Sequence, residues 1–188
     1  MRLHSMLVAG LVAFSFMIPG ALAADADKAK KQAEIQKMAR EALQEFYKTE
    51  PKLKEEVEKA AGYAVFSTFG LSFIVGGSGG KGLAHDNKTN TDTYMHQAQA
   101  SAGVQAGIAQ SRTLIVFKSP ATFKSFIDTG WDVGAGGGAG AAVQGKGAGG
   151  TAGGTFGSDT SVYTLTRTGL QAGFGVAGSK FWKDKELN

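Results

Sequence analysis

The sequence predicts an α+β protein in which N-terminal amphipathic helices pack on a strongly curled, glycine-rich antiparallel β-sheet, which can become barrel-like. A helical period of apolar residues before position 61 and two-residue alternation after position 62 predict the two parts. The 28 glycines, with only three prolines, predict the curl. One short helix near residue 120 interrupts the strands. With 188 residues and 43% hydrophobic content, the chain can bury a core.

The composition excludes several classes of function. Without cysteine, the chain has no disulfide framework, no zinc-cysteine or iron–sulfur site and no cysteine nucleophile. The glycines follow no G-x-y period, so the chain is not collagen-like. A formal charge of +4 is too small to demand a nucleic-acid partner. We expect no nucleic acid, no metal and no cofactor.

Residues 1–23 have the pattern of a secretory signal peptide. Arg2 precedes an apolar run from residue 7 to residue 18, and small residues at Ala21 and Ala23 form a cleavage site. The run is shorter than the roughly 20 residues of a membrane span. We expect cleavage before Ala24 and an exported, soluble protein of the periplasm or cell envelope. The alternative is an uncleaved anchor.

Residues 24–61 are predicted to form the N-terminal helical segment. Pro51 begins a second helix, which we expect Gly62 to end. The first helix carries an apolar stripe with helical spacing, made of Ile35, Met38, Ala39, Ala42, Leu43 and Phe46. Its cations are concentrated toward the front: Lys28, Lys30, Lys31, Lys37 and Arg40. Two interpretations follow. The stripe packs on the domain with solvated lysines outside, or the basic front half lies on an anionic lipid surface.

Residues 62–188 are predicted to form a glycine-rich β body. Alternation runs from Tyr94 to Ile108 with one apolar face, and residues 113–117 form an apolar strand. Ser119 and Pro120 cap and start the short helix, which Gly130 closes. Repeated glycines on a strand face indicate that aromatic rings or another backbone lie flat on it, or that the sheet curls tightly. The alternative for residues 134–157 is a flexible loop.

The glycine motifs do not fit nucleotide-binding sites. Residues 77–82 match G-x-G-x-x-G, but a strand and a turn follow where a dinucleotide fold needs a helix. Lys81, placed in this glycine loop, could meet a phosphate through neighbouring bare amides. It could equally be a solvated turn lysine.

No catalytic template is complete, so we expect no enzyme. His85 and His96 lack an acidic partner at ligand spacing, and His96 is expected to be a satisfied, half-buried imidazole. Asp128 and Asp132 flank Trp131, but turn and cap roles explain them. An unrecognised hydrolase using these residues is the enzymatic alternative.

Six short motifs, in order, resemble the SYLF domain family over about residues 38–183. They lie at residues 62–66, 76–82, 99–107, 115–117, 126–130 and 163–181, and one departure is Ser67, where many members carry proline. The resemblance implies a lipid-binding module that prefers phosphoinositides and other acidic lipids, with contacts on a basic amphipathic N-terminal helix. Some eukaryotic members also bind actin, which an exported bacterial protein would not meet, so actin is an unlikely partner.

The sequence thus predicts a non-catalytic protein that docks on acidic phospholipid or phosphoinositide-like headgroups. The C-terminal tail adds cations beside interfacial aromatic residues, although Phe181 and Trp182 can instead close the core. The alternative function is an envelope assembly protein that uses a sheet edge or the helix stripe. The predicted lipid contacts are Lys28, Lys30, Lys31, Lys37, Arg40, Lys81, Lys180, Trp182 and Lys183.

Overall fold

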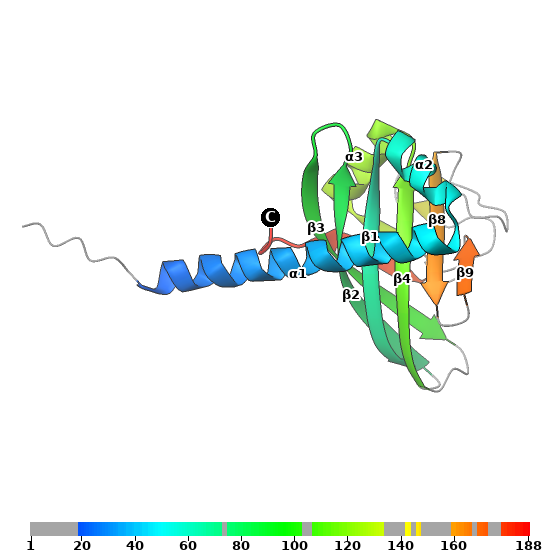
Figure 1. Cartoon of the computed structure of the whole chain (residues 1–188). Coiled ribbons are helices and arrows are strands. Elements are labelled where there is room, and N and C mark those ends of the chain that lie inside the picture. Colours follow the sequence, from blue (N-terminus) through cyan, green and yellow to red (C-terminus); the bar gives the residue numbers. More distant parts are fainter. Residues whose placement is uncertain are drawn as a thin grey trace, which may run out of the picture.

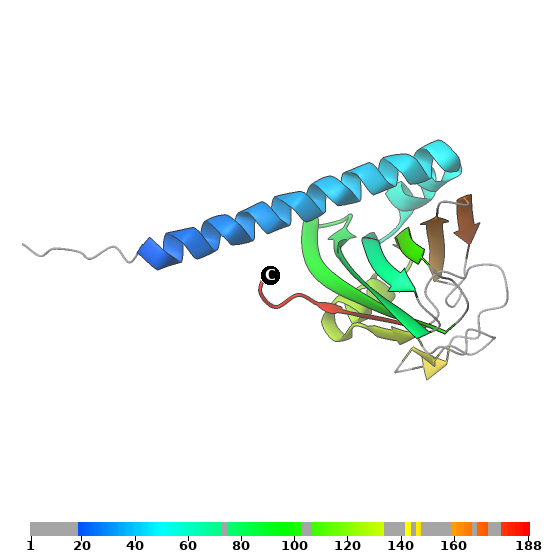
Figure 2. The ribbon, with the colours of Figure 1, turned by 90° about the horizontal axis from the view of Figure 1, so that it is seen from below.

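The computed structural model describes residues 19–72, 75–102, 107–133, 142–143, 146–147, 159–166, 169–172 and 178–188. Two N-terminal helices, α1 (Pro19–Thr49) and α2 (Lys52–Lys59), precede the strands. A long stretch of α1 crosses one face of the sheet, and its N-terminal part extends beyond the sheet edge (Figures 1 and 2).

The predicted apolar stripe of α1 packs on the domain. The side chains of Ile35, Ala39, Ala42, Leu43 and Phe46 are buried there, and Met38 is partly buried. The second helix is α2, which buries Leu53 and Val57 beside them. It ends three residues before the expected Gly62, which is instead the first residue of β1, because Ala60 already has extended backbone angles.

The main sheet has eight antiparallel strands in the order β5-β10-β3-β2-β1-β4-β8-β9. It curls into a half-barrel whose described edges are β5 and β9 (Figure 2). A small separate pair is formed by β6 (Ala142–Val143) and β7 (Lys146–Gly147). The strands of the main sheet are β1 (Gly62–Ser72), β2 (Val75–Asp86), β3 (Thr91–Ala102), β4 (Gly107–Phe117), β5 (Trp131–Val133), β8 (Thr160–Thr166), β9 (Gly169–Ala172) and β10 (Ser179–Lys183).

Alternation along the strands gives the sheet two buried faces. Val65, Leu83 and Tyr94 belong to the cluster under α1 and α2. The opposite face holds an aromatic cluster that includes Phe66 and Phe181, covered by α3 (Pro120–Thr129). The start of α3 is capped as predicted, since Ser119 Oγ accepts a hydrogen bond from the Thr122 amide at 3.4 Å.

Strand glycines have two different surroundings. A Cβ on Gly82 would lie 2.1 Å from the Val65 carbonyl oxygen and 2.5 Å from the Phe66 ring. An aromatic side chain therefore covers this glycine, as the sequence predicted. A Cβ on Gly79 would meet no atom within 4 Å, so the space above it is open.

One strand prediction was wrong in detail and one was not tested. The alternation from Tyr94 to Ile108 is divided, because β3 ends at Ala102 and β4 begins at Gly107; residues 103–106 lie outside the described residues. The same two-residue alternation of small residues continues from β3 into β4, so periodicity alone does not reveal that the chain reverses direction between them. Residues 134–157, for which strand structure was predicted with a flexible loop as the alternative, fall almost entirely outside the described residues.

Candidate functional site

The candidate site begins with a row of side chains across the sheet. Ser67 of β1 pairs with Lys81 of β2, which pairs with His96 of β3, which pairs with Trp182 of β10. Two residues away along each strand, and on the same face of the sheet, Val65, Leu83 and Tyr94 form the buried row under α1. The row containing Lys81 therefore lies where the apolar floor beneath the helix gives way to a polar surface.

Beyond β10, residues 184–188 form a short C-terminal segment built on Asp184. This buried carboxylate accepts hydrogen bonds at Oδ1 from the amides of Glu186 (2.9 Å) and Leu187 (3.1 Å). Its other oxygen, Oδ2, lies 2.8 Å from His96 Nε2. The Asp184 carboxylate thus has internal partners at both oxygens, and it fixes the turn and the His96 imidazole.

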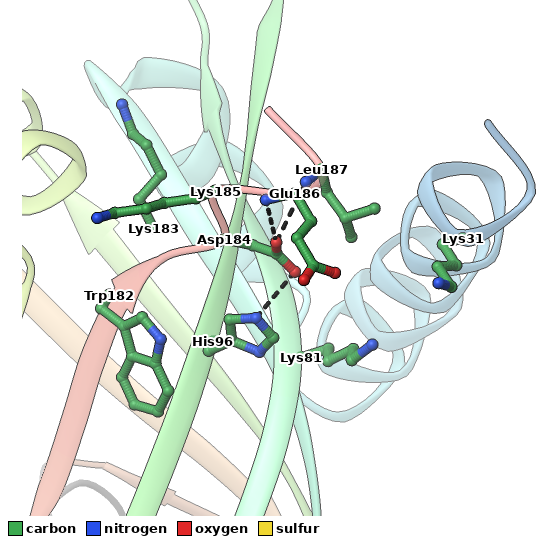
Figure 3. A pocket seen from close by; sticks show the side chains of 9 residues that line it. All are labelled: Lys31, Lys81, His96, Trp182, Lys183, Asp184, Lys185, Glu186 and Leu187. Carbon is green, nitrogen blue, oxygen red and sulfur yellow. Dashed lines mark hydrogen bonds and ion pairs between the residues drawn. The ribbon is translucent and has the colours of Figure 1, made fainter. Parts of the chain in front are cut away.

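The C-terminal segment is also attached to α1. Gln32 donates to the Leu187 carbonyl at 2.7 Å, and Lys28 Nζ donates to the Asn188 backbone oxygen at 3.1 Å. The Leu187 side chain is buried in the same cluster as Ile35. As a result α1, the sheet and the C-terminal segment enclose a cleft of about 490 Å³ (Figure 3). Its lining residues are Lys31, Lys81, His96, Trp182, Lys183, Asp184, Lys185, Glu186 and Leu187.

Cations dominate the cleft but do not all point the same way. The amino groups of Lys31 and Lys81 point into the space between α1 and β2, as does the Glu186 carboxylate (Figure 3). Lys183 and Lys185 extend from the other side of the C-terminal segment (Figure 3). Among the described residues, neither these two lysines nor Lys81 has a carboxylate within ion-pair distance.

Lys31 has a local partner on its own helix. Its Nζ lies 2.6 Å from Asp27 Oδ2, one turn earlier. The hydrogen bond and charge of Asp27 raise the pKa of Lys31, and the same contact lowers the pKa of Asp27. Both side chains are exposed, so this pair can exchange with an external anion at little cost.

Trp182 is the one exposed large hydrophobic side chain in the described part of the chain, with 39% of its surface accessible. Its indole stacks on the His96 ring, with centroids 5.4 Å apart and planes 28° apart. Phe181 points to the other face and is buried. The two predictions for the tail therefore apply to different residues, since Phe181 closes the core and Trp182 faces solvent.

The basic residues predicted on α1 divide between two faces. Lys28 and Lys31 lie on the side of the C-terminal segment. Lys30, Lys37 and Arg40 are exposed on the far side of the helix, where Lys37 lies 3.9 Å from Glu41.

Three of the remaining predicted contacts line the cleft, namely Lys81, Trp182 and Lys183, whereas Lys180 lies outside it, 3.8 Å from Asp132. The prediction that Lys81 lies in a glycine loop was wrong. The residue is inside β2, and its backbone takes part in the ladders with β1 and β3. Because those strands surround it, any anion must be bound by its side chain.

The sequence analysis missed the partners of both histidines. His85 Nδ1 lies 2.7 Å from Asp92 Oδ1, directly across the β2–β3 hairpin, and His96 contacts Asp184 of the C-terminal segment. The first pairing could have been found from the hairpin register, since a strand and a turn were predicted to follow residues 77–82. The second depends on β10 lying beside β3, for which the sequence carries no local signal.

Two further observations concern only the described ranges. They contain no cluster of three or more histidine, aspartate or glutamate side chains that could hold a metal ion. No helix within them is both long enough and apolar enough to cross a bilayer.

The fold and the cleft define an α+β half-barrel protein whose candidate site is a surface cleft of charged and aromatic side chains. Residues 98–188 match the family model described as Ysc84, Las17-binding protein actin regulator. Beta cell expansion factor A of Aeromonas veronii is 32% identical over 164 residues, which cover 85% of this chain and 60% of that protein.

Residues 98–188 thus carry a match to the SYLF family, and the relative from Aeromonas veronii, a SYLF-family protein, is similar over 85% of this chain. The chain spans about 60% of the length of the relative from Aeromonas veronii.

Proposed function

We propose that this protein binds acidic phospholipid headgroups at a membrane surface through the cleft between α1 and the C-terminal segment. The observation that carries the proposal is the convergence of Lys31 and Lys81 on one space, with Lys183 and Lys185 beside it. Asp184 does not cancel them, because His96 and two backbone amides already hold its carboxylate. Glu186 is the carboxylate that opposes the lysines.

The arrangement supports a surface contact better than the basic helix does alone. The exposed far face of α1 alternates Lys30, Lys37 and Arg40 with Glu34 and Glu41, so its charge largely cancels. Each lysine near an anionic membrane is worth roughly 1 kcal/mol, and the attraction decays within about 10 Å at 0.1 M salt. Trp182, exposed beside these lysines, has the amphipathic ring that suits headgroup depth.

Cosedimentation with vesicles tests this proposal. Wild-type protein should bind vesicles of phosphatidylcholine containing phosphatidylserine or phosphatidylinositol phosphate, and should release them as salt is raised. Lys81→Glu replaces an attractive charge by a repulsive one and should weaken binding roughly tenfold or more at low salt. Lys88→Glu is the matched control, because Lys88 is equally exposed but lies in the turn at the far end of β2.

Two results would contradict the proposal. One is equal binding to vesicles of phosphatidylcholine alone. The other is a Lys81→Glu variant that binds anionic vesicles no more weakly than the Lys88→Glu control. A preference for phosphatidylinositol phosphate over phosphatidylserine at equal charge would show that the two walls of the cleft, Lys31 and Lys81, share one multiply charged headgroup.

We further propose that the protein is exported and acts in the periplasm or cell envelope. The support is the pattern of residues 1–23. Cleavage before Ala24 would remove the first residues of α1, which begins at Pro19, and would leave Lys28 and Lys31 in place. Intact-mass measurement of protein recovered from the periplasm should give a chain beginning at Ala24. A full-length chain confined to the cytoplasm would contradict export.

A further inference from the structure

A second hollow adjoins the cleft on the same face of the sheet. Its volume is about 570 Å³, and it shares Lys81, His96 and Trp182 with the cleft. Its other lining residues are Ser67, Gly79, Gly80, Gln97 and Ala98. The three shared side chains therefore separate two hollows, one with lysines along its walls and one with small residues along its floor.

The floor of this second hollow is nearly bare. Gly79 of β2 and Ala98 of β3 are register partners on the face toward α1, in the row next to Lys81 and His96. A Cβ on Gly79 would meet no atom within 4 Å. Glycine weakens a strand and usually marks a close approach by another group. At Gly82 that group is Phe66, whereas at Gly79 the described part of the chain supplies none.

The second hollow is a groove whose walls are suited to an amphiphile. Trp182 presents an exposed indole along one side. The Lys81 side chain is exposed where the groove meets the cleft, and no carboxylate in the described part of the chain neutralises it. A ligand lying here would meet a flat apolar floor, an aromatic wall and a cation at one end.

We propose that this groove binds the hydrocarbon chain of a single-chain anionic amphiphile, with its phosphate at Lys81. The inference rests on the proposed function, because the same lysine would hold the headgroup, and it adds the class of lipid. A single chain fits the observations, because the floor is one register pair, Gly79 and Ala98, beside the row of Lys81 and His96. The volume is within the range of small-molecule sites, about 300–1,000 Å³.

Calorimetry with lysophosphatidic acids of increasing chain length, each below its micelle concentration, tests the inference. Glycerol 3-phosphate serves as the headgroup alone and lysophosphatidylcholine as the zwitterionic counterpart. Affinity should rise with chain length, by up to roughly fourfold for each fully buried methylene, until the groove is filled. Lysophosphatidylcholine should bind more weakly than lysophosphatidic acid of equal length.

The discriminating variant is Gly79→Val, which fills the floor. The open space above Gly79 accepts the new side chain, and valine favours strands, so the variant should fold at least as well as wild type. It should lose the dependence on chain length and bind the longest lysophosphatidic acid at least tenfold more weakly, while glycerol 3-phosphate binding is unchanged. Thr93→Val, on the opposite face of β3, is the control and should bind as wild type does.

The outcomes separate the two proposals. If Lys81→Glu leaves anionic-vesicle binding unchanged, the proposed function fails. If Lys81→Glu weakens vesicle binding while Gly79→Val keeps the wild-type affinity for lysophosphatidic acid, the groove is not the chain site and only this inference fails. Failure of wild-type protein to bind any lysophosphatidic acid, or affinities independent of chain length, would also overturn it.

Discussion

Tyr94 and Asn188 exchange two hydrogen bonds, as opposed residues of neighbouring antiparallel strands do. The Tyr94 amide donates to Asn188 Oδ1 at 3.0 Å, and Asn188 Nδ2 donates to the Tyr94 carbonyl at 2.8 Å. The side chain of Asn188 thus extends the pairing of β3 beyond the end of β10. It thereby holds against β3 the C-terminal segment, whose backbone oxygens bond to α1 and which forms one wall of the cleft.

Removing this side chain should therefore destabilise the protein. Asn188→Ala leaves the Tyr94 amide without its partner, which should lower the free energy of unfolding by about 1–3 kcal/mol. Urea denaturation of an untagged chain measures the change. Lys185→Ala, an exposed substitution in the same segment, should stay within about 0.5 kcal/mol of wild type. Equal midpoints for the two variants would show that Asn188 is not part of the support.

Asp184 should be the second support of the C-terminal segment. Asp184→Asn removes the negative charge and one of the two acceptor oxygens, so that one side-chain oxygen can no longer serve both His96 and the turn, and we expect a loss of about 1–3 kcal/mol. Hydrogen exchange at the amides of Glu186 and Leu187 should become faster. The control is Asp132→Asn, whose exposed pair with Lys180 should contribute no more than about 1 kcal/mol. Unchanged exchange in the Asp184 variant would refute the role.

Two glycines of β2 should respond oppositely to the same substitution. Gly82→Ala places a methyl group against the Val65 carbonyl and the Phe66 ring, and overpacking of this kind costs about 1–3 kcal/mol. Gly79→Ala meets open space and should stabilise the strand by about 0.5–1 kcal/mol. Thermal unfolding of the two variants provides the comparison. A stabilised Gly82→Ala protein would mean that the Phe66 ring does not lie on this glycine.

Tyr163 should ionise late in an alkaline titration. Burial, and then the hydrogen bond to Glu56 at 2.7 Å, raise the pKa of Tyr163 to about 12, whereas an unfolded tyrosine has a pKa of about 10. The raised pKa means that the neutral phenol stabilises the fold. This contribution is complete below pH ~10 and is lost as pH rises through ~12.

Tyrosinate absorbance measures this titration. Burial also raises the pKa of Tyr47 to about 12 and raises the pKa values of Tyr63 and Tyr94, so Tyr163→Phe should show one late tyrosine fewer than wild type. The substitution should also make the fall in the free energy of unfolding between pH ~10 and ~12 smaller, because Tyr163 no longer contributes to it. Ionisation of every tyrosine near pH 10 in protein that is still folded would contradict the assignment.

Glu186→Gln should strengthen binding to anionic vesicles. Its carboxylate points into the same space as Lys31 and Lys81, so it opposes an incoming phosphate (Figure 3). Loss of one negative charge near the surface should raise affinity by roughly fivefold at low salt. Glu34→Gln, on the exposed far face of α1, should change affinity less. Equal gains for the two variants would show that net charge matters and the cleft does not.

Much of the fold could be predicted because its signals are local. The spacing from Ile35 to Phe46 identifies the buried side of α1, and Ser119 with Pro120 marks the start of α3. The alternation of residues along a predicted strand assigns the wrong face where the chain reverses direction without a recognisable turn signal. Val162 and Leu170 are both even-numbered and would share one face of a continuous strand, but β8 and β9 form an antiparallel pair, so the two residues lie on opposite faces.

The site was only partly predictable. Composition pointed to Lys81, Trp182 and Lys183 as candidate contacts, but not to their meeting with Lys31 in one cleft. That meeting depends on β10 pairing with β3 and on the C-terminal segment contacting α1. Contacts such as that between His96 and Asp184 join residues far apart in sequence, and no local spacing encodes them.

The attachment of Asn188 to both Tyr94 and Lys28 has a practical consequence for labelling. An affinity handle or fluorophore fused after Asn188 would begin beside the cleft and would compete with these contacts, which makes a loss of vesicle binding by such a fusion uninformative. The solvent-facing side of α1, around Lys37, is a safer position for a reporter.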